Sequence, residues 1–212
     1  MVLLLKQQEK LADFNLNKTA FVIGNGTSRR TIPLPDLSEK GITYGCNALY
    51  REFSPDYLIA VDVKMVVEIN KSRYQHDNQV WTNPNKAYSQ FNGFNFFNPS
   101  KGWSSGPTAL LLASDHGYDQ IYILGFDYIG INDKINNMYA DTPNYKKSTD
   151  KSTYYNNWLK QTHAVISKNS NTKYVRVVDN ELLFTPKELS KLDNLTHITV
   201  EKFKEIFNLD EN

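Results

Sequence analysis

Short apolar segments rich in β-branched residues recur along this chain and constrain its fold more than any other feature. The clearest are residues 20–23, 42–47, 57–62 and 120–127. Strands that are apolar on both faces are typical of parallel sheets that helices cover on both sides. Because these segments alternate with stretches of helical spacing, we expect an α/β fold with a mostly parallel sheet and helices on both faces.

The remaining elements complete this pattern. Further strands are expected at 79–82, 94–97 and 173–178, the last of these being the final strand. Helices are expected at 63–71, directly after 104–107, at 152–168, after 185–188 and at 200–207. No internal repeat or linker divides the sequence, so we expect residues 1–212 to form a single Rossmann-like nucleotide-binding domain.

Composition narrows the possible partners. Lys and Arg total 24 and Asp and Glu total 23, so the net charge of +1 argues against duplex nucleic acid as a partner. The single cysteine, Cys46, cannot form an intramolecular disulfide, and no apolar run is long enough to span a membrane. We therefore expect a cytoplasmic protein. The 13 tyrosines and 11 phenylalanines could form an apolar surface patch through which the protein associates into a homo-oligomer.

Polar residues stand at the ends of four expected strands: Asn25, Asn47, Asp62 and Asp127. Parallel α/β sheets bind ligands outside the carboxyl ends of their strands, so these side chains are expected to meet. Each also has a plainer interpretation. Asn47 could cap a helix over 48–53, and each aspartate could be a helix cap or a member of a buried salt bridge.

The turn Gly24-Asn25-Gly26-Thr27-Ser28 follows the first expected strand. Glycines allow the backbone to approach an anion closely, so Gly24, Asn25, Gly26 and Ser28 are candidates for binding the phosphates of a nucleotide. The turn is not a dinucleotide-binding motif, because Arg29 stands where the third glycine belongs. The alternative is a tight turn with no ligand.

A second candidate anion site is the helix start at Ser104, Ser105 and Gly106, where free N–H groups and the helix dipole favour negative charge. Plain capping by Ser105 is the alternative. Asp62 could bind a ribose or a metal, but Lys64 stands where a second carboxylate would be needed, so no metal site is expected.

The segment 139–155 carries several tyrosines together with Lys146 and Lys147. Such a loop could close over a bound nucleotide, and the hydroxyl of Tyr145 could stabilise a leaving phosphate. A merely solvated loop is the alternative.

Taken together, these blocks resemble the bacterial sialyltransferases typified by the Campylobacter lipooligosaccharide enzymes, and related phage and bacterial proteins. The similarity lies in the Gly24–Ser28 turn, the Cys46-Asn47 pair, Ser104-Ser105-Gly106 and the segment 117–128. The resemblance implies metal-independent transfer from a CMP-sugar, the nucleotide sugar being a substrate with no separate cofactor. It places Asn25, Asn47, Ser105 and Gly106 around the nucleotide and Tyr145 near the leaving phosphate.

The chain departs from that family at the catalytic base, because its residues 144–150 contain no histidine after the tyrosine loop. It is also shorter than those enzymes and lacks most of their acceptor-binding C-terminal part. Asp127 or Asp150 is the expected replacement for the histidine, so the catalytic candidates are Asp127, Tyr145 and Asp150. Two alternatives remain open: a Mg²⁺-dependent phosphotransferase or pyrophosphokinase with Asp62 or Asp127 as ligand, and a non-catalytic nucleotide-binding phage protein.

Overall fold

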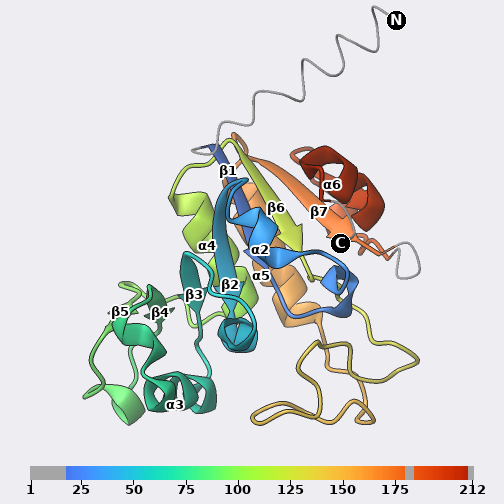
Figure 1. Ribbon diagram of the computed structural model, residues 1–212. Helices are drawn as coiled ribbons and strands as arrows, with labels where there is room; N and C mark the ends of the chain where they lie inside the picture. Colours follow the sequence, from blue (N-terminus) through green and yellow to red (C-terminus); the bar gives the residue numbers. More distant parts are fainter. Residues whose placement is uncertain (1–17, 180–183, 210–212) are drawn as a thin grey trace, which may run out of the picture.

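The computed structural model describes residues 18–179 and 184–209. The strands in these ranges form one sheet in which all neighbouring pairs are parallel. They are β1 (Thr19–Ile23), β2 (Ile42–Cys46), β3 (Tyr57–Ile59), β4 (Val80–Thr82), β5 (Phe94–Phe96), β6 (Gln120–Leu124), β7 (Lys173–Val178) and β8 (Leu195–Thr199). Their order is β5-β4-β3-β2-β1-β6-β7-β8 (Figure 1). The predicted α/β, Rossmann-like fold is confirmed.

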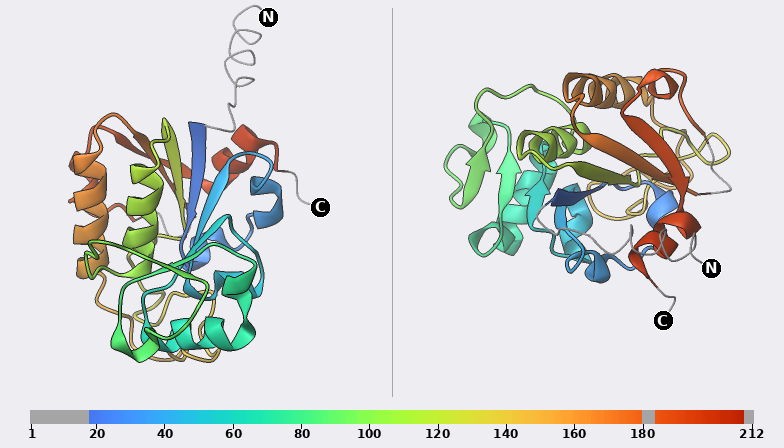
Figure 2. Two further views of the ribbon diagram at one scale, coloured as in Figure 1. Left: turned by 90° about the vertical axis from the view of Figure 1, so that its left-hand side faces the viewer. Right: turned by 90° about the horizontal axis from the view of Figure 1, so that it is seen from above.

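Helices cover both faces of the sheet (Figure 2). They are α2 (Leu34–Leu37), α3 (Val63–Ser72), α4 (Ser105–Asp115), α5 (Asn156–Lys168) and α6 (Val200–Phe207). In β1, Phe21 and Ile23 belong to the core cluster that includes α2, α3 and α6, whereas Ala20 and Val22 belong to the cluster that includes α4 and α5. The strand is apolar at successive positions because both of its faces are buried.

The direction in which strands are added to the sheet reverses between β1 and β6. β1 pairs with β2 on one side and with β6 on the other, and later strands extend the sheet outward from each. In open parallel sheets, ligands bind in the crevice outside the carboxyl ends of the strands at such a reversal. The turn at Gly24 and the turn at Gly125 therefore flank the expected binding crevice.

One strand was not expected from the sequence. β8 pairs with β7 in parallel, so the expectation that 173–178 would be the last strand is wrong. Most of its side chains are only partly buried, and its sequence mixes two threonines and a histidine with two apolar residues. An edge strand of this kind lacks the continuous apolar character of a buried parallel strand.

Most of the expected helices are present, and the one expected over 200–207 has the expected ends. The helix after 104–107 is α4, the one expected over 152–168 begins later as α5, and 200–207 is α6. After 185–188 there is only a 3₁₀ turn, Leu189–Lys191, and the short helix α2 was not expected.

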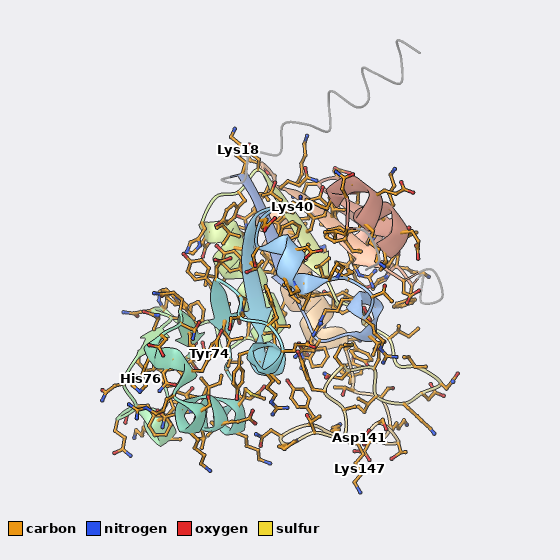
Figure 3. All side chains as sticks on the ribbon, viewed as in Figure 1. Lys18, Lys40, Tyr74, His76, Asp141 and Lys147 are labelled. Atoms are coloured by element: carbon orange, nitrogen blue, oxygen red, sulfur yellow. The ribbon has the colours of Figure 1, made fainter. Side chains whose placement is uncertain are left out.

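The long segment between β6 and α5 lies below the carboxyl edge of the sheet in Figure 1. Figure 3 shows Asp141 and Lys147 at its outer tip, at the opposite end of the molecule from Lys18, which precedes β1. Asn136 and Tyr145 hydrogen-bond back to the turn after β1. These contacts rule out the alternative of a merely solvated loop for this part of the segment.

Candidate functional site

A cavity of about 640 Å³ opens at the carboxyl edge of the sheet, beside the crevice between β1 and β6. Most of the residues proposed from the sequence line it: Gly24, Asn25, Gly26, Asn47, Asp62, Ser104, Ser105, Gly106, Asp127 and Tyr145. Asn25, Asn47 and Ser105 come from three separate turns and share this cavity, as the strand-end argument requires.

The glycines after β1 are required by the close approach of the segment after β6. A Cβ on Gly24 would lie 2.7 Å from the carbonyl oxygen of Gly125, and a Cβ on Gly26 would collide with the Asp127 carboxylate. The N–H of Gly26 donates to the carbonyl oxygen of Gly125 at 2.9 Å. Close backbone packing at the crevice therefore explains both glycines without a ligand.

Other N–H groups of this turn are bound within the protein and do not face an open anion site. Thr27 N donates to Asn136 Oδ1 at 2.9 Å, and Ser28 N donates to Asp127 Oδ2 at 3.1 Å. The Asp127 carboxylate thus occupies the position that a phosphate would take in the expected cradle. The turn instead contributes to the cavity through the side chain of Asn25.

Asp127 holds the turn after β1 against the end of β6. Its side chain is buried, and Ser28 Oγ donates to Oδ1 at 2.5 Å while Asn136 Nδ2 donates to Oδ2 at 3.0 Å. The buried Arg176 donates to the main-chain oxygen of Asp127 at 3.1 Å. Because both carboxylate oxygens are engaged, we assign Asp127 a structural role in place of the catalytic one expected from the sequence.

The first turn of α4 presents free N–H groups to the cavity. The first intrahelical hydrogen bond runs from Thr108 N to Ser104 O at 3.0 Å, which leaves the N–H groups of Ser105 and Gly106 without an intrahelical acceptor. The helix has 11 residues, so its dipole adds positive potential at this end. An anion placed here would receive two N–H donors.

The hydroxyl of Ser105 ties the ends of β2 and β3 to this helix. It donates to Asn47 Oδ1 at 2.8 Å and accepts from Val61 N at 3.1 Å. Asn47 has a φ of 53°, in the left-handed region, directly after β2. Neither Ser105 nor Asn47 caps its own helical segment, so the capping alternatives weighed for these residues are wrong.

Asn25 lines the cavity and carries a buried, unpaired acceptor. Its Nδ2 donates to the Cys46 carbonyl oxygen at 3.4 Å and to the Tyr145 hydroxyl at 3.2 Å, and the residue is 9% exposed. The contact with the carbonyl fixes which end of the amide is nitrogen. Oδ1 is buried and has no partner. Buried polar atoms are normally satisfied, so this oxygen is an exception within the turn after β1.

The hydroxyl of Tyr145 accepts hydrogen bonds from Asn25 Nδ2 and, at 3.4 Å, from Ala48 N. Its own proton has no acceptor among the described residues. Burial raises the pKa of the Tyr145 phenol well above its ordinary value, so the group stays protonated at neutral pH. Tyr145 can therefore donate its proton to an anion in the cavity.

Asp62 is the carboxylate of this cavity that is available for chemistry. It occupies the N-cap position of α3, as the capping alternative expected, but its side chain makes no capping hydrogen bond. Its side chain is exposed at the cavity, yet the surrounding walls remove enough water to raise the pKa of the carboxyl above its usual value. A raised pKa makes the carboxylate a stronger base.

Two sequence candidates lie outside the cavity lining. The side chain of Ser28 is used in its bond to Asp127. Asp150 is exposed, and its Oδ2 accepts a hydrogen bond from Lys147 N at 3.0 Å. Asp150 is thus not placed to act on a ligand in this cavity, and its expected role as base is not supported by its position.

Cys46 lines the cavity, but its environment disfavours the thiolate form that a nucleophile requires. It is almost fully buried, and burial raises the pKa of its thiol to about 12. The sequence interpretation of Cys46 as a small buried apolar residue agrees with this environment. Within residues 18–179 and 184–209, no group of three or more His, Cys, Asp or Glu side chains could hold a metal ion.

Sequence reasoning did not propose Lys64 or Trp158 as site residues, and it named Lys146 and Tyr155 only as members of the loop expected to close over a ligand. Lys64 and Lys146 line the cavity and are exposed, so their charges face solvent at its mouth. Tyr155 and Trp158 form an aromatic edge, with ring centroids 5.5 Å apart. The position of Lys64 two residues after Asp62 was a usable signal, whereas Trp158 lies in an ordinary amphipathic helix.

Comparison of the chain with protein-family models, curated proteins and solved structures finds no match. No helix within the described part of the chain combines the length and apolar character needed to cross a bilayer. The resemblance to the CMP-sugar sialyltransferases therefore remains an expectation from the sequence motifs.

Proposed function

We propose that this protein is a glycosyltransferase that takes a nucleotide sugar, with a CMP-sugar favoured, and transfers the sugar without a metal ion. The convergence of Asn25, Asn47 and Ser105 in one cavity beside a helix N-terminus carries the proposal. Neutral amides and hydroxyls at the reversal point of a parallel sheet suit a nucleotide. The motif similarity to CMP-sugar enzymes selects the reaction class.

The donor phosphate is assigned to the first turn of α4. The N–H groups of Ser105 and Gly106 offer it hydrogen bonds, and the protonated Tyr145 hydroxyl offers a third. Lys64 and Lys146 add positive charge from the mouth of the cavity. Together these groups can stabilise charge on a leaving nucleotide, which is the task that a divalent cation performs in many other transferases.

Asp62 is proposed as the general base in place of the family's histidine. The oxygen of an acceptor hydroxyl forms a bond to the anomeric carbon of the donor, and the bond from that carbon to the phosphate oxygen breaks. The nucleotide leaves with the bonding electron pair, and the hydroxyl proton passes to the Asp62 carboxylate. The raised pKa of that carboxylate and its lack of a capping bond support this assignment.

The two alternatives make different demands on the same cavity. A Mg²⁺-dependent phosphotransferase needs carboxylate ligands, but of the two carboxylates lining the cavity Asp127 has both oxygens engaged. A non-catalytic nucleotide-binding protein has no need for a free carboxylate such as Asp62. Both features favour metal-independent transfer.

A panel of nucleotides and nucleotide sugars in a thermal-shift assay, followed by chromatography of the ligand, tests the proposal. We expect CMP and CMP-sugars to stabilise the fold, by about 2.7 kcal/mol at a hundredfold excess over Kd. Slow hydrolysis of the sugar donor should continue in excess chelator. Stabilisation without turnover of any donor would favour the non-catalytic alternative, and loss of turnover in chelator would favour the phosphotransferase.

Matched asparagine variants locate the ligand. Asn25→Ala should weaken the CMP-induced shift because the Asn25 amide lines the cavity and holds Tyr145. Asn95→Ala serves as the control, since the Asn95 side chain hydrogen-bonds Gln79 and Val80 beside the β4–β5 edge. An unchanged shift in Asn25→Ala would place the nucleotide elsewhere.

A further inference from the structure

A second, more open cavity of about 730 Å³ adjoins the first. It lies between α3 and the turn at residues 142–144, and we call it the α3 groove. Val63, Lys64 and Asn144 line both cavities. Because Asp62 directly precedes Val63, a molecule lying along the α3 groove reaches the donor cavity beside the proposed base.

The walls of the α3 groove are joined by a polar network. Arg51 donates to both carboxylate oxygens of Glu68 on α3, at 2.8 and 2.7 Å, and to Thr142 Oγ1 at 2.8 Å. Asn144 Nδ2 also donates to Glu68, at 2.6 Å. These bonds link the helix to the loop, so the two walls of the groove are fixed relative to each other.

The charge that remains in the α3 groove is positive. The Arg51 guanidinium neutralises Glu68 through the paired hydrogen bonds. Lys64 and Lys71 are both exposed, and their spacing of seven residues puts them on the same face of α3. Neither has an ion-pair partner among the residues that the structure describes. Val67 lies between them and gives the floor an apolar surface.

We propose that the α3 groove binds the acceptor of the transfer reaction and that this acceptor is an anionic saccharide carrying a carboxylate or a phosphate. The two unpaired lysines match such an anion, and Val67 matches the apolar face of a sugar ring. The inference rests on the proposed function, because it presupposes a sugar donor in the neighbouring cavity.

Matched acceptors test the charge preference. Transfer from the CMP-sugar that the wild type hydrolyses is measured to galactose, galacturonate and galactose 6-phosphate, and to the corresponding glucose series. We expect kcat/KM for at least one anionic member to exceed that of its neutral counterpart about tenfold at low ionic strength, and the preference to shrink in high salt. The galacturonate and phosphate arms tell a carboxylated acceptor from a phosphorylated one.

A charge-reversal variant then tests whether the preference for anionic acceptors arises in the α3 groove. Lys71→Glu changes a residue that lines the α3 groove and not the donor cavity, so it should lower the ratio of anionic to neutral kcat/KM to about one or below. Lys173→Glu is the control, since Lys173 is also exposed but begins β7, toward the opposite edge of the sheet. It should leave the ratio unchanged.

The outcomes separate the two proposals. Donor hydrolysis with equal transfer to neutral and anionic acceptors, or an anion preference that Lys71→Glu leaves intact, overturns the acceptor assignment and leaves the proposed function standing. Absence of turnover with every donor overturns both. Circular dichroism of Lys71→Glu shows whether the variant has kept its fold.

Discussion

Replacing Asp127 with asparagine tests whether this residue is structural, as its contacts indicate, or catalytic, as its place in the sequence suggests. The carboxylate accepts hydrogen bonds from Ser28 N, Ser28 Oγ and Asn136 Nδ2. The asparagine side chain would turn an amide group toward at least one of these donors. Hydrogen bonds to charged groups contribute about 1.5–3 kcal/mol each, so we expect the free energy of unfolding to fall by about 3 kcal/mol.

A double-mutant cycle with Ser28→Ala isolates one of these bonds. Ser28→Ala removes only the hydroxyl donor and should cost about 1.5 kcal/mol. Because Ser28 and Asp127 are in contact, the double variant should lose less stability than the two single changes combined, by about 1.5 kcal/mol. Urea denaturation followed by circular dichroism gives all four free energies of unfolding, with unchanged m values supporting two-state behaviour.

The cycle has a clear contrary result. If Asp127→Asn changes the free energy of unfolding by less than about 0.5 kcal/mol and yet abolishes donor turnover, Asp127 acts on the substrate and our structural assignment is wrong. Additive effects of the two substitutions would likewise show that the Ser28–Asp127 bond does not hold the turn after β1 in place.

Three further substitutions test the cavity. Tyr145→Phe should lower the kcat of donor turnover about 10- to 150-fold by removing one donor to a charged group, while the free energy of unfolding changes by less than about 1 kcal/mol, because both hydrogen bonds to the hydroxyl are long. A kcat within twofold of wild type would exclude Tyr145 from phosphate binding. Asp62→Asn should lower kcat. Because burial raises the folded-state pKa of Asp62, its ionised form opposes folding above that pKa, so the variant should melt at a higher temperature than wild type at pH 7. The wild-type rate should fall as pH drops through this raised pKa, and a rate that does not change in acid would refute the base assignment. Gly26→Ala should lower the free energy of unfolding by about 3 kcal/mol, because its Cβ would collide with the Asp127 carboxylate; a wild-type urea midpoint would contradict that packing.

The sheet was the part of the fold most open to prediction. β1 and β6 are short, apolar on both faces and each followed directly by a glycine, so their type and their parallel direction follow from local pattern. Polar residues that follow such strands meet at one edge of the sheet, and this rule was enough to predict that Asn25, Asn47 and Asp62 share one site. β8 was not predicted because a half-exposed edge strand lacks the continuous apolar run of a buried strand.

The roles of individual residues were harder to predict because they depend on distant contacts. Asn136 binds both Thr27 and Asp127, but it sits 109 residues from Thr27 in a polar loop. Its local sequence gives no sign of this. Asp127 has the same local signature as a catalytic carboxylate, and only its partners reveal that both oxygens are engaged. No sequence pattern separates these two cases.

Arg29 is another residue whose role depends on distant contacts and could not be predicted from its local sequence. Arg29 stands beside Arg30, and two adjacent cations usually lie at a solvated surface, yet Arg29 is 2% exposed and donates to the Gly24 carbonyl oxygen at 2.7 Å and to Glu52 at 2.8 Å. A buried arginine needs a full set of acceptors, and here these come from the turn after β1 and from Glu52. Arg29, which stands where the dinucleotide motif has its third glycine, thus stabilises the turn after β1.

A crystal structure of the protein with CMP tests the central claim most directly. We predict that the CMP phosphate lies within about 3.2 Å of the N–H groups of Ser105 and Gly106 and of the Tyr145 hydroxyl. CMP bound outside this cavity, or a cavity that stays empty at a CMP concentration that saturates the thermal shift, would contradict the account.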